Sequence, residues 1–272
     1  AMAPVFAEQV RDRPLHFAFT YDEEVGCFGA QALVDSLKAK GIRPGVAIIG
    51  EPTSMRIIEG HKGCYEYTTH FSGLAGHGSA PDRGVNAVEY AARYINRLLA
   101  LKDALRARAP SDSRFEPPWT TINTGSVKGG VAHNVIASNA SIEWEMRPVQ
   151  ASDAAFVKDD LRQYCRDVLL PAMQSICPDA NIVTEVIGEV DGLEPAEMNE
   201  AKAILMELTG ANGAELVPFG TEAGIFQQYG MSAVVCGPGS IDQAHKPDEY
   251  VSLDQLQQCL DMLGRLGTKL AA

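Results

Sequence analysis

The sequence lacks any apolar run of the roughly 18 residues that would cross a bilayer. Its N-terminal stretch also lacks the basic-then-apolar order of a signal peptide. Positive charge is scarce, since 23 Lys and Arg against 35 Asp and Glu give a formal net charge of −12. These absences argue against nucleic acid and membrane partners and make a cytoplasmic location the default expectation.

No CxxC pair is present either, and the cysteines are scattered along the chain. They are Cys27, Cys64, Cys165, Cys177, Cys236 and Cys259. A chain of 272 residues with 46% hydrophobic content can bury a core without disulfides. We therefore expect one large or two modest domains, with reduced core thiols and no zinc-thiolate site.

The first part of the chain has an α/β pattern. Residues 16–20 (HFAFT) and 46–49 (VAII) are typical of buried strands, with a helix expected over 30–40 between them. Gly41 and Pro44 supply the end of that helix. The β–α–β order predicts a parallel sheet.

From residue 65 the pattern changes to the β-α-β-β-α-β order of a ferredoxin-like module. The expected elements are a strand at 65–71, a helix at 86–101, strands at 121–127 and 137–146, a helix at 153–169 and a strand at 181–187. We take residues 68–180 as an inserted domain that splits the first domain into 1–67 and 181–272. The proline-rich stretch 114–119 is expected to be a loop within the insert.

The last segment returns to α/β character. A helix is expected over 199–208, ended by Gly210, followed by a strand at 232–236. A final helix should begin at Ser252, with a capping box to Gln255. Its core stripe would be Leu253, Leu256, Leu260 and Leu263.

Three polar motifs could form a metal site. Glu23 and Glu24 stand in an acidic run at the end of the first expected strand, and Glu51 follows the second. Carboxylates so close to one another repel unless a cation neutralises the repulsion. Open α/β folds also place their binding sites at the ends of sheet strands. His245 lies in a late polar loop. Taken singly, each motif has a plainer interpretation: the acidic run as a solvated turn, Glu51 as part of an ordinary Glu-Pro turn, and His245 as a solvated histidine. Taken together, they supply the kinds of donor that zinc accepts.

The strings TYDEEVGC, GEPTSM, GHKGCYE, GHGSAPDRGVNAVEYA, HNVIA, EWEMRP, FGTEAGIF and AHKPDEY follow one another along the chain. In this order the sequence resembles the dimerising two-zinc amidohydrolases and exopeptidases, over essentially its whole length. The family includes acetylornithine deacetylases, succinyl-diaminopimelate desuccinylases, aminoacylases and glutamate carboxypeptidases, and the first four strings are most similar to the first of these. The resemblance implies a split zinc-peptidase-like catalytic domain with a mixed sheet, interrupted by a ferredoxin-like dimerisation lid.

The resemblance also implies roles for the acidic motifs. Glu23 would be the general base that activates a water, and Glu24 would bind one zinc ion together with His245. Glu51 would bind the second zinc ion. Two Zn²⁺ ions per site are implied for the complete family member, with Co²⁺ as a possible substitute.

In the lid, the resemblance assigns His77 to the partner subunit's active site, where it would steady an oxyanion, and Asn134 to closing the same site. Arg147 would pair with a substrate carboxylate. The plainer alternatives are a loop histidine and a surface arginine. A homodimer through the lid is therefore expected.

The resemblance further places Gly220, Thr221, Glu222 and Gly239 in loops that line the substrate pocket. Glu222 would suit a cationic substrate side chain, or would instead be a carboxylate favoured by a helix N-terminus. His61, His70 and His133 are left as structural.

The leading interpretation is hydrolysis of N-acetyl-L-ornithine to L-ornithine and acetate, a step of arginine biosynthesis. A desuccinylase, aminoacylase or dipeptidase, and a non-catalytic dimerising protein, remain alternatives. The family also needs a histidine from a His-x-Asp motif and a bridging aspartate, and residues 1–15 contain neither. We therefore expect the chain to lack its first part, to bind zinc weakly and to be nearly inactive alone.

Overall fold

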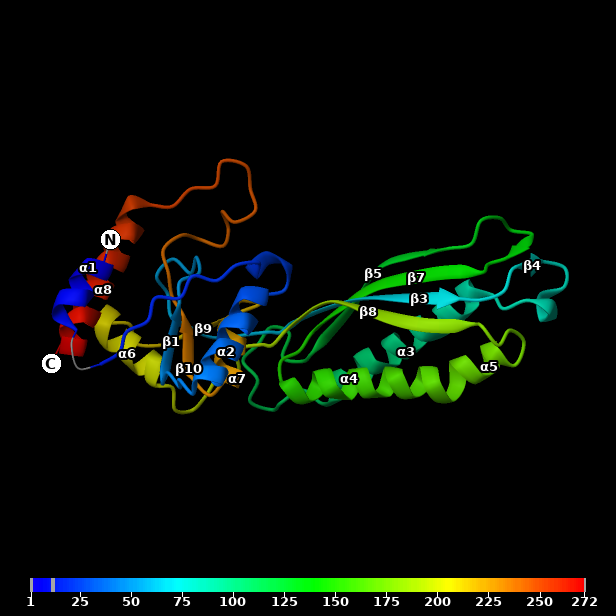
Figure 1. Cartoon of the computed structure of the whole chain (residues 1–272), viewed down its shortest axis with the longest axis horizontal. Helices are drawn as coiled ribbons and strands as arrows, with labels where there is room; N and C mark the ends of the chain where they lie inside the picture. The colour runs from blue at the N-terminus through cyan, green and yellow to red at the C-terminus, as the bar shows by residue number, and fades with distance from the viewer. Residues whose placement is uncertain (1, 11–12, 272) are drawn as a thin grey trace. The chain divides into compact units, whose positions relative to one another are not determined.

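The computed structural model describes residues 2–10 and 13–271 and divides into two compact units. The outer unit comprises Ala1–His61 and Gly192–Ala272, and the inserted unit comprises Lys62–Asp191 (Figure 1). The inserted unit is wider than the expected 68–180, because β3 (Cys64–Ser72) and β8 (Asn181–Val190) are neighbouring strands of one sheet. The end points 1 and 272 of the expected outer segments lie outside the described residues.

The outer unit contains a mixed sheet in the order β1-β10-β2-β9. Strands β1 (Val46–Ile49) and β10 (Ser232–Val235) run parallel, while β2 (Ile58–His61) is antiparallel to β10. The last strand, β9 (Glu215–Val217), runs parallel to β2. The expected strands at 46–49 and 232–236 are confirmed.

The outer unit's helices include α1 (Ala3–Gln9), α2 (Phe28–Lys40) and α6 (Glu200–Thr209). Two more are α7 (Ala223–Gln228) and α8 (Leu253–Ala271). Gly41 and Gly210 end α2 and α6 in the left-handed conformation, with φ of 66° and 75°. Both helix ends are therefore as expected from the glycines.

The expectation of a buried strand at residues 16–20 is wrong. This segment belongs to no strand, and Phe17 and Phe19 are 49% and 92% exposed. A strand needs a hydrogen-bonding neighbour. Within the described chain, β1 is paired along one edge only, with β10, and no strand lies beside 16–20.

The expected leucine stripe of the last helix is confirmed only at Leu263, which is half-buried and packs against the core of the outer unit. Helix α8 begins at Leu253, but Leu253, Leu256 and Leu260 are exposed. Its buried residues are Met262, Leu266 and Gly267, in a core with Phe6 of α1 and Leu205 of α6. The apolar residues of α8 cover a wide face, and α1 and α6 pack against the part of it that carries Met262 and Leu266.

The expected capping box at the start of α8 is replaced by another contact. The Oε1 atom of Gln255 accepts the backbone N–H of Gly239 at 2.6 Å. The side chain that was expected to cap the helix therefore ties it to the Gly237–Gly239 turn.

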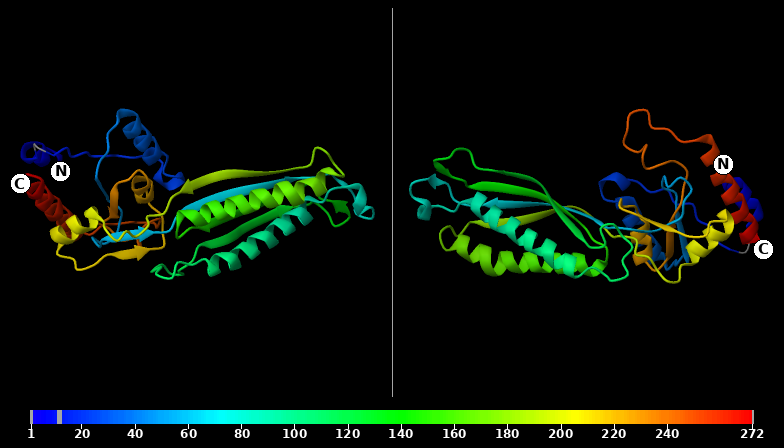
Figure 2. Two further views of the ribbon diagram at one scale, coloured as in Figure 1. Left: turned by 90° about the horizontal axis from the view of Figure 1, so that it is seen from below. Right: turned by 180° about the vertical axis from the view of Figure 1, so that it is seen from behind.

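The inserted unit has an antiparallel sheet in the order β5-β7-β3-β8. Strands β5 (Thr121–Gly129) and β7 (Asn139–Arg147) join β3 and β8. Helices α3 (Ala87–Ala107) and α4 (Ala151–Tyr164) cover one face, as Figure 2 shows, and α4 continues through residues Cys165–Leu169 into α5 (Leu170–Gln174). The expected β-α-β-β-α-β order is confirmed, and a short ribbon of β4 (Gly76–His77) and β6 (Val135–Ile136) is added.

Alternation along β3 explains how the inserted unit closes its core. Tyr65, Tyr67, Thr69 and Phe71 point to the buried side, while the alternate residues are half-buried or exposed. The Tyr67 ring stacks on Trp144 of β7 at 4.5 Å between centroids. One face of the sheet is therefore packed under the helices.

The state of the cysteines and the length and polarity of the helices can be compared with the expectations from the sequence. All six cysteines are free thiols; Cys27 and Cys236 are buried and the others half-buried. Among the described residues, no helix is both long and apolar enough to cross a membrane.

Candidate active site

Carboxylates from separate parts of the sequence converge in the outer unit. Glu23 lies on a short 3-10 helix, η1 (Glu23–Val25), Glu51 follows β1, and Glu222 precedes α7. Burial, and then the charges of Glu51, Glu24 and Glu222, raise the pKa of Glu23 to about 7. A carboxyl group with a pKa near neutrality can both accept and donate a proton, as general acid–base work requires.

The backbone around Glu23 is held in a tight turn. Asp22 and Cys27 both have left-handed φ values, 54° and 56°. Gly29 donates its N–H to the Tyr21 carbonyl at 2.9 Å, and a Cβ there would lie 2.3 Å from the Tyr21 nitrogen. A glycine is required at this position because the backbones touch.

Glu24 and His245 lie close together although 221 positions separate them in the sequence. Nε2 of His245 lies 3.6 Å from Oε2 of Glu24, and both side chains are exposed. His245 itself has a left-handed φ of 60°. Two of the expected zinc donors are thus neighbours.

Glu51 and Glu222 form the more buried side of the cluster. Burial is the main cause that raises the pKa of Glu51, followed by the charges of Glu222 and Glu24. Glu222 is 6% exposed, and its Oε1 atom has no hydrogen-bond partner within the described part of the chain. Burial raises the pKa of Glu222 as well, against a hydrogen bond with Thr20 that lowers it.

The loops that the resemblance places around a substrate pocket are held by their own contacts. The Thr221 hydroxyl lies 3.0 Å from Nε2 of His61 and accepts the N–H of Ala223 at 3.1 Å. Gly239 has φ of 97°, but its N–H is engaged by Gln255, so this amide is not open to a ligand here. Gly220 is half-buried.

In the inserted unit, His77 and Asn134 are neighbours in the β4–β6 ribbon. His77 is paired with Val135, and Gly78 donates its N–H to the Asn134 carbonyl at 2.8 Å. The Ser79 N–H donates to Nδ1 of His77 at 3.2 Å, so a neutral imidazole bears its proton on Nε2. An exposed Nε2–H is a suitable donor to an oxyanion.

Arg147 lies in the four-stranded sheet of the inserted unit, at the end of β7 away from this ribbon. The ribbon follows the end of β3, where Ser72 pairs with Asn139 at the start of β7, whereas Arg147 ends β7. Eight strand steps separate the two ends, roughly 27 Å. Arg147 is bound to Glu145, with 2.7 Å between a guanidinium nitrogen and Oε2.

Residues 59–173 match the family model described as a peptidase dimerisation domain. An acetylornithine deacetylase of Klebsiella pneumoniae is 32% identical over 254 residues, which cover 93% of this chain and 63% of the relative. One of Salmonella typhimurium is 35% identical over 239 residues, covering 88% of this chain and 60% of the relative. The chain belongs to the M20 peptidase family. It spans less than two thirds of the length of these relatives.

Solved structures support the same fold for this M20 chain. A tripeptidase from Staphylococcus aureus has a TM-score of 0.67 at 19% identity, and an aminopeptidase from Bacillus cereus has 0.65 at 18%. Each comparison covers 93% of this chain and 63% of the other. At such identities the likeness concerns the fold alone.

M20 enzymes are typically zinc-dependent, and the donors of this chain fit a zinc site only in part. Glu24 and His245 are an oxygen and an imidazole donor close together, of the kinds that zinc accepts. Within residues 2–10 and 13–271, however, no group of three His, Cys, Asp or Glu side chains is placed to hold a metal ion. The described residues therefore supply part of a coordination sphere without completing one.

The structure also reveals polar residues that sequence reasoning did not single out. Cys27, four residues after Glu23, places its Sγ 3.9 Å from the Glu23 Oε1. Lys62 is buried, and its ammonium group donates to the carbonyls of Pro117 at 2.7 Å and Trp119 at 3.2 Å. The four-residue spacing of Glu23 and Cys27 could have predicted their contact. The contacts of Lys62 could not be predicted in this way, because Pro117 and Trp119 lie far along the chain.

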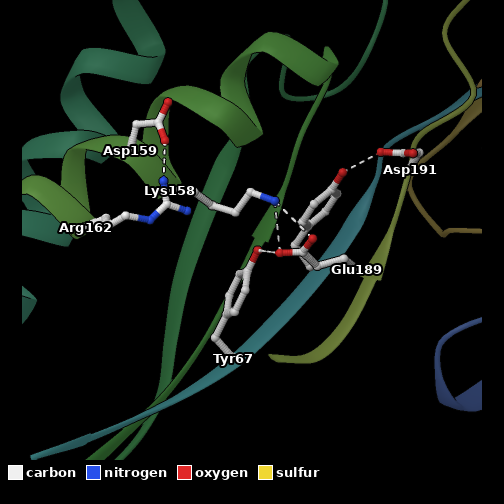
Figure 3. Close-up of polar contacts among 7 residues, drawn as sticks. Tyr67, Lys158, Asp159, Arg162, Glu189 and Asp191 are labelled. Atoms are coloured by element: carbon white, nitrogen blue, oxygen red, sulfur yellow. Dashed lines mark hydrogen bonds and ion pairs between the residues drawn. The ribbon is translucent and has the colours of Figure 1, made fainter. Parts of the chain in front are cut away.

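A second polar cluster lies in the inserted unit of this M20 chain, between α4 and the strands β3 and β8 (Figure 3). Tyr67 donates to Oε1 of Glu189 at 2.6 Å, and Lys158 donates to Oε2 of Glu189 at 3.0 Å. Tyr65 donates to Asp191 at 2.5 Å. Because these groups satisfy one another, we interpret the cluster as a structural tie that holds α4 to the sheet.

Proposed function

We propose that this chain acts in the hydrolysis of N-acyl amino acids, with N-acetyl-L-ornithine as the leading substrate and L-ornithine and acetate as the products. The observation that supports this most is the convergence of Glu23, at a pKa of about 7, with Glu51 and the Glu24–His245 pair. The acetylornithine deacetylases among the relatives guide the choice of substrate.

In this proposal Glu23 is the general base. It takes a proton from the attacking water and later gives it to the leaving amine nitrogen. Its half-buried position and the neighbouring charges raise its pKa to about 7, so near neutral pH the carboxylate can take the proton and the carboxyl can then give it up.

Glu24, Glu51 and His245 are the chain's donors to bound zinc in the proposed enzyme. Zinc in such a site supplies Lewis acidity to the acyl oxygen and to water. Because the described residues do not complete the coordination, the chemical step assigned to this chain is the proton transfer by Glu23.

We further propose that the protein is a homodimer in which His77 and Asn134 serve the partner's site. The support is that His77 and Asn134 are neighbours at one end of the inserted unit, roughly 27 Å of strand away from Arg147. A substrate carboxylate bound by Arg147 would therefore be out of reach of His77 in the same copy. Arg147 would have to exchange Glu145 for the substrate.

A non-catalytic dimerising protein is the second candidate. The observation in its favour is that no three metal donors meet among the described residues. The two candidates differ in whether an amine is released.

The test is amine release from N-acetyl-L-ornithine, N-succinyl-diaminopimelate and a dipeptide, with zinc supplied. We expect N-acetyl-L-ornithine to be preferred, and Glu23→Gln to lower kcat roughly 100-fold or more, because it removes the base. Glu197→Gln, an exposed position of the same unit, is the matched control and should leave kcat unchanged. Unaltered turnover by Glu23→Gln would refute the role of Glu23, and no release from any substrate would favour the non-catalytic candidate.

A further inference from the structure

His61 is a buried histidine of the outer unit that the proposed reaction does not use. It ends β2 and is 1% exposed. Its backbone N–H donates to the Leu193 carbonyl at 3.0 Å, and the sheet register pairs it with Val217 of β9. Because β2 lies between β10 and β9 in the sheet, the backbone of His61 is a rigid point from which its side chain can act.

The imidazole of His61 meets a buried hydroxyl group. Its Nε2 atom lies 3.0 Å from Oγ1 of Thr221, which is also 1% exposed. The same oxygen accepts the N–H of Ala223 at 3.1 Å. The hydroxyl proton is therefore left to donate to Nε2, the acceptor that the described part of the chain places beside it.

This hydrogen bond fixes the protonation state of the ring. If Nε2 carried a proton and donated it to Thr221, the buried hydroxyl proton would lack an acceptor among the described residues, which costs free energy. His61 is therefore neutral, with its ring proton on Nδ1.

The two hydrogen bonds of Thr221 fix the backbone on both sides of Glu222, which stands between Thr221 and Ala223. Glu222 is 6% exposed. Its charge is among the causes that raise the pKa of Glu51 and of Glu23, so its carboxylate lies near both of theirs. The contact between His61 and Thr221 thus bears on the geometry of the acidic cluster.

A tie is needed here because the cluster pushes its own members apart. Like charges repel one another, and a buried carboxylate gains hydration when it moves toward water. The link from β2 through His61 to Thr221 opposes such a movement of Glu222. Without an acceptor at position 61, the hydroxyl of Thr221 would rotate freely and the start of α7 would lose this anchor to the sheet.

We propose that His61 is a positioning residue of the acidic site: its Nε2 atom accepts the Thr221 hydroxyl and so holds Glu222 beside Glu51 and Glu23. The inference rests on the proposed function in treating this acidic cluster as the site of reaction. It goes beyond that function by making a buried residue of the sheet act on the site through Thr221.

The ring proton of His61 provides the first test, on the unmodified chain. Nitrogen-15 NMR distinguishes the two neutral forms of a histidine ring from each other and from the charged ring. We expect the form with its proton on Nδ1 at pH 7. A proton on Nε2 would overturn the inference, because Nε2 could not then accept from Thr221.

Hydrogen exchange of the Ala223 amide tests the tie without requiring turnover. His61→Leu removes the acceptor, and we expect the Ala223 N–H to exchange roughly 10-fold faster, as loss of one buried hydrogen bond implies. His61→Gln keeps an acceptor oxygen and should exchange at close to the unmodified rate. His16→Leu, at an exposed histidine of the same unit, is the control.

Two results of the exchange experiment would overturn the inference. One is an unchanged rate at Ala223 in His61→Leu. The other is an equal rise at every amide of the outer unit, because His61 would then stabilise the unit as a whole without positioning this loop. If His61→Leu does not fold, the NMR measurement on the unmodified chain decides.

Amine release separates this inference from the proposed function. If the unmodified chain turns over, we expect His61→Leu to lower kcat roughly 10-fold with KM unchanged, and His61→Gln to restore most of the loss. An unaltered kcat in His61→Leu would overturn the inference and leave the function standing. If the unmodified chain releases no amine, the function fails, whereas the ring proton and the Ala223 exchange still decide whether His61 holds Thr221.

Discussion

Burial acts on single ionisable residues of this chain in opposite directions. It raises the pKa of the Glu23 carboxyl to about 7 and lowers the pKa of the Lys62 ammonium to about 8. In each case the charged form is disfavoured where water is excluded. For Lys62 the charge of Glu116 opposes the shift in part, and the carbonyls of Pro117 and Trp119 accept from its nitrogen.

Lys62 should give stability a distinct pH dependence. As pH falls from 10.5, the unfolded chain protonates Lys62 first, whereas the folded chain does so only near pH 8. The contribution of Lys62 to the free energy of unfolding should therefore rise as pH increases from about 8 to about 10. We expect Lys62→Met to remove this rise.

Urea unfolding at pH 7, 8, 9 and 10 measures the effect as the difference between the unmodified chain and Lys62→Met. Other titrating groups are common to both proteins and cancel in the difference. Lys40→Met, at an exposed position, is the control and should give a constant difference. A constant difference for Lys62→Met as well would contradict the prediction.

At the scale of elements, the inserted unit is held by side chains that link a helix to strands. Lys158 of α4 meets Glu189 of β8, and Glu189 in turn accepts from Tyr67 of β3. Since β3 and β8 are adjacent, one carboxylate joins three elements. The contact lies at the end of the sheet where the chain enters and leaves the unit.

Removing one hydroxyl from this cluster should weaken the inserted unit measurably. Tyr67→Phe keeps the ring stacked on Trp144 but deletes the hydrogen bond to Glu189. We expect a loss of about 1.5 to 3 kcal/mol in the free energy of unfolding, typical of a hydrogen bond to a charged group. The free energy of unfolding should be measured by denaturant for Tyr67→Phe and for the control Tyr164→Phe, which changes a half-buried ring of the same unit. Equal losses of stability in the two variants would mean that the hydroxyl of Tyr67 makes no specific contribution.

At the scale of the whole molecule, the dimerisation domain and the separation of His77 from Arg147 both favour a shared site. We expect light scattering at micromolar concentration to give twice the chain mass of 29.2 kDa. A stable monomer would rule out any role of His77 in a partner's site.

Subunit mixing provides the functional counterpart of that measurement. If His77 acts across the dimer, a heterodimer of Glu23→Gln and His77→Ala subunits retains one intact site, and random mixing should restore about a quarter of the unmodified activity. If His77 acts within its own chain, the mixture should be as inactive as each variant alone. His77→Ala should leave the measured mass unchanged.

Local patterns of the sequence were sufficient where an element depends on its own residues. The strands and helices of the inserted unit follow from alternation and helical spacing, and Gly41 and Gly210 end their helices because glycine adopts a left-handed backbone freely. The family also followed from the sequence, through motifs in a fixed order.

Tertiary structure decided what depends on neighbours. Residues 16–20 have the composition of a strand, but no strand of the described residues pairs with them. Helix α8 buries Met262 and Leu266 because α1 and α6 lie on that side. The meeting of Glu24 with His245 and the unpaired oxygen of Glu222 arise between segments that are remote in the sequence. Hydrogen bonding and burial are properties of pairs of segments, so a single segment's pattern can name the candidates but cannot tell which of them meet.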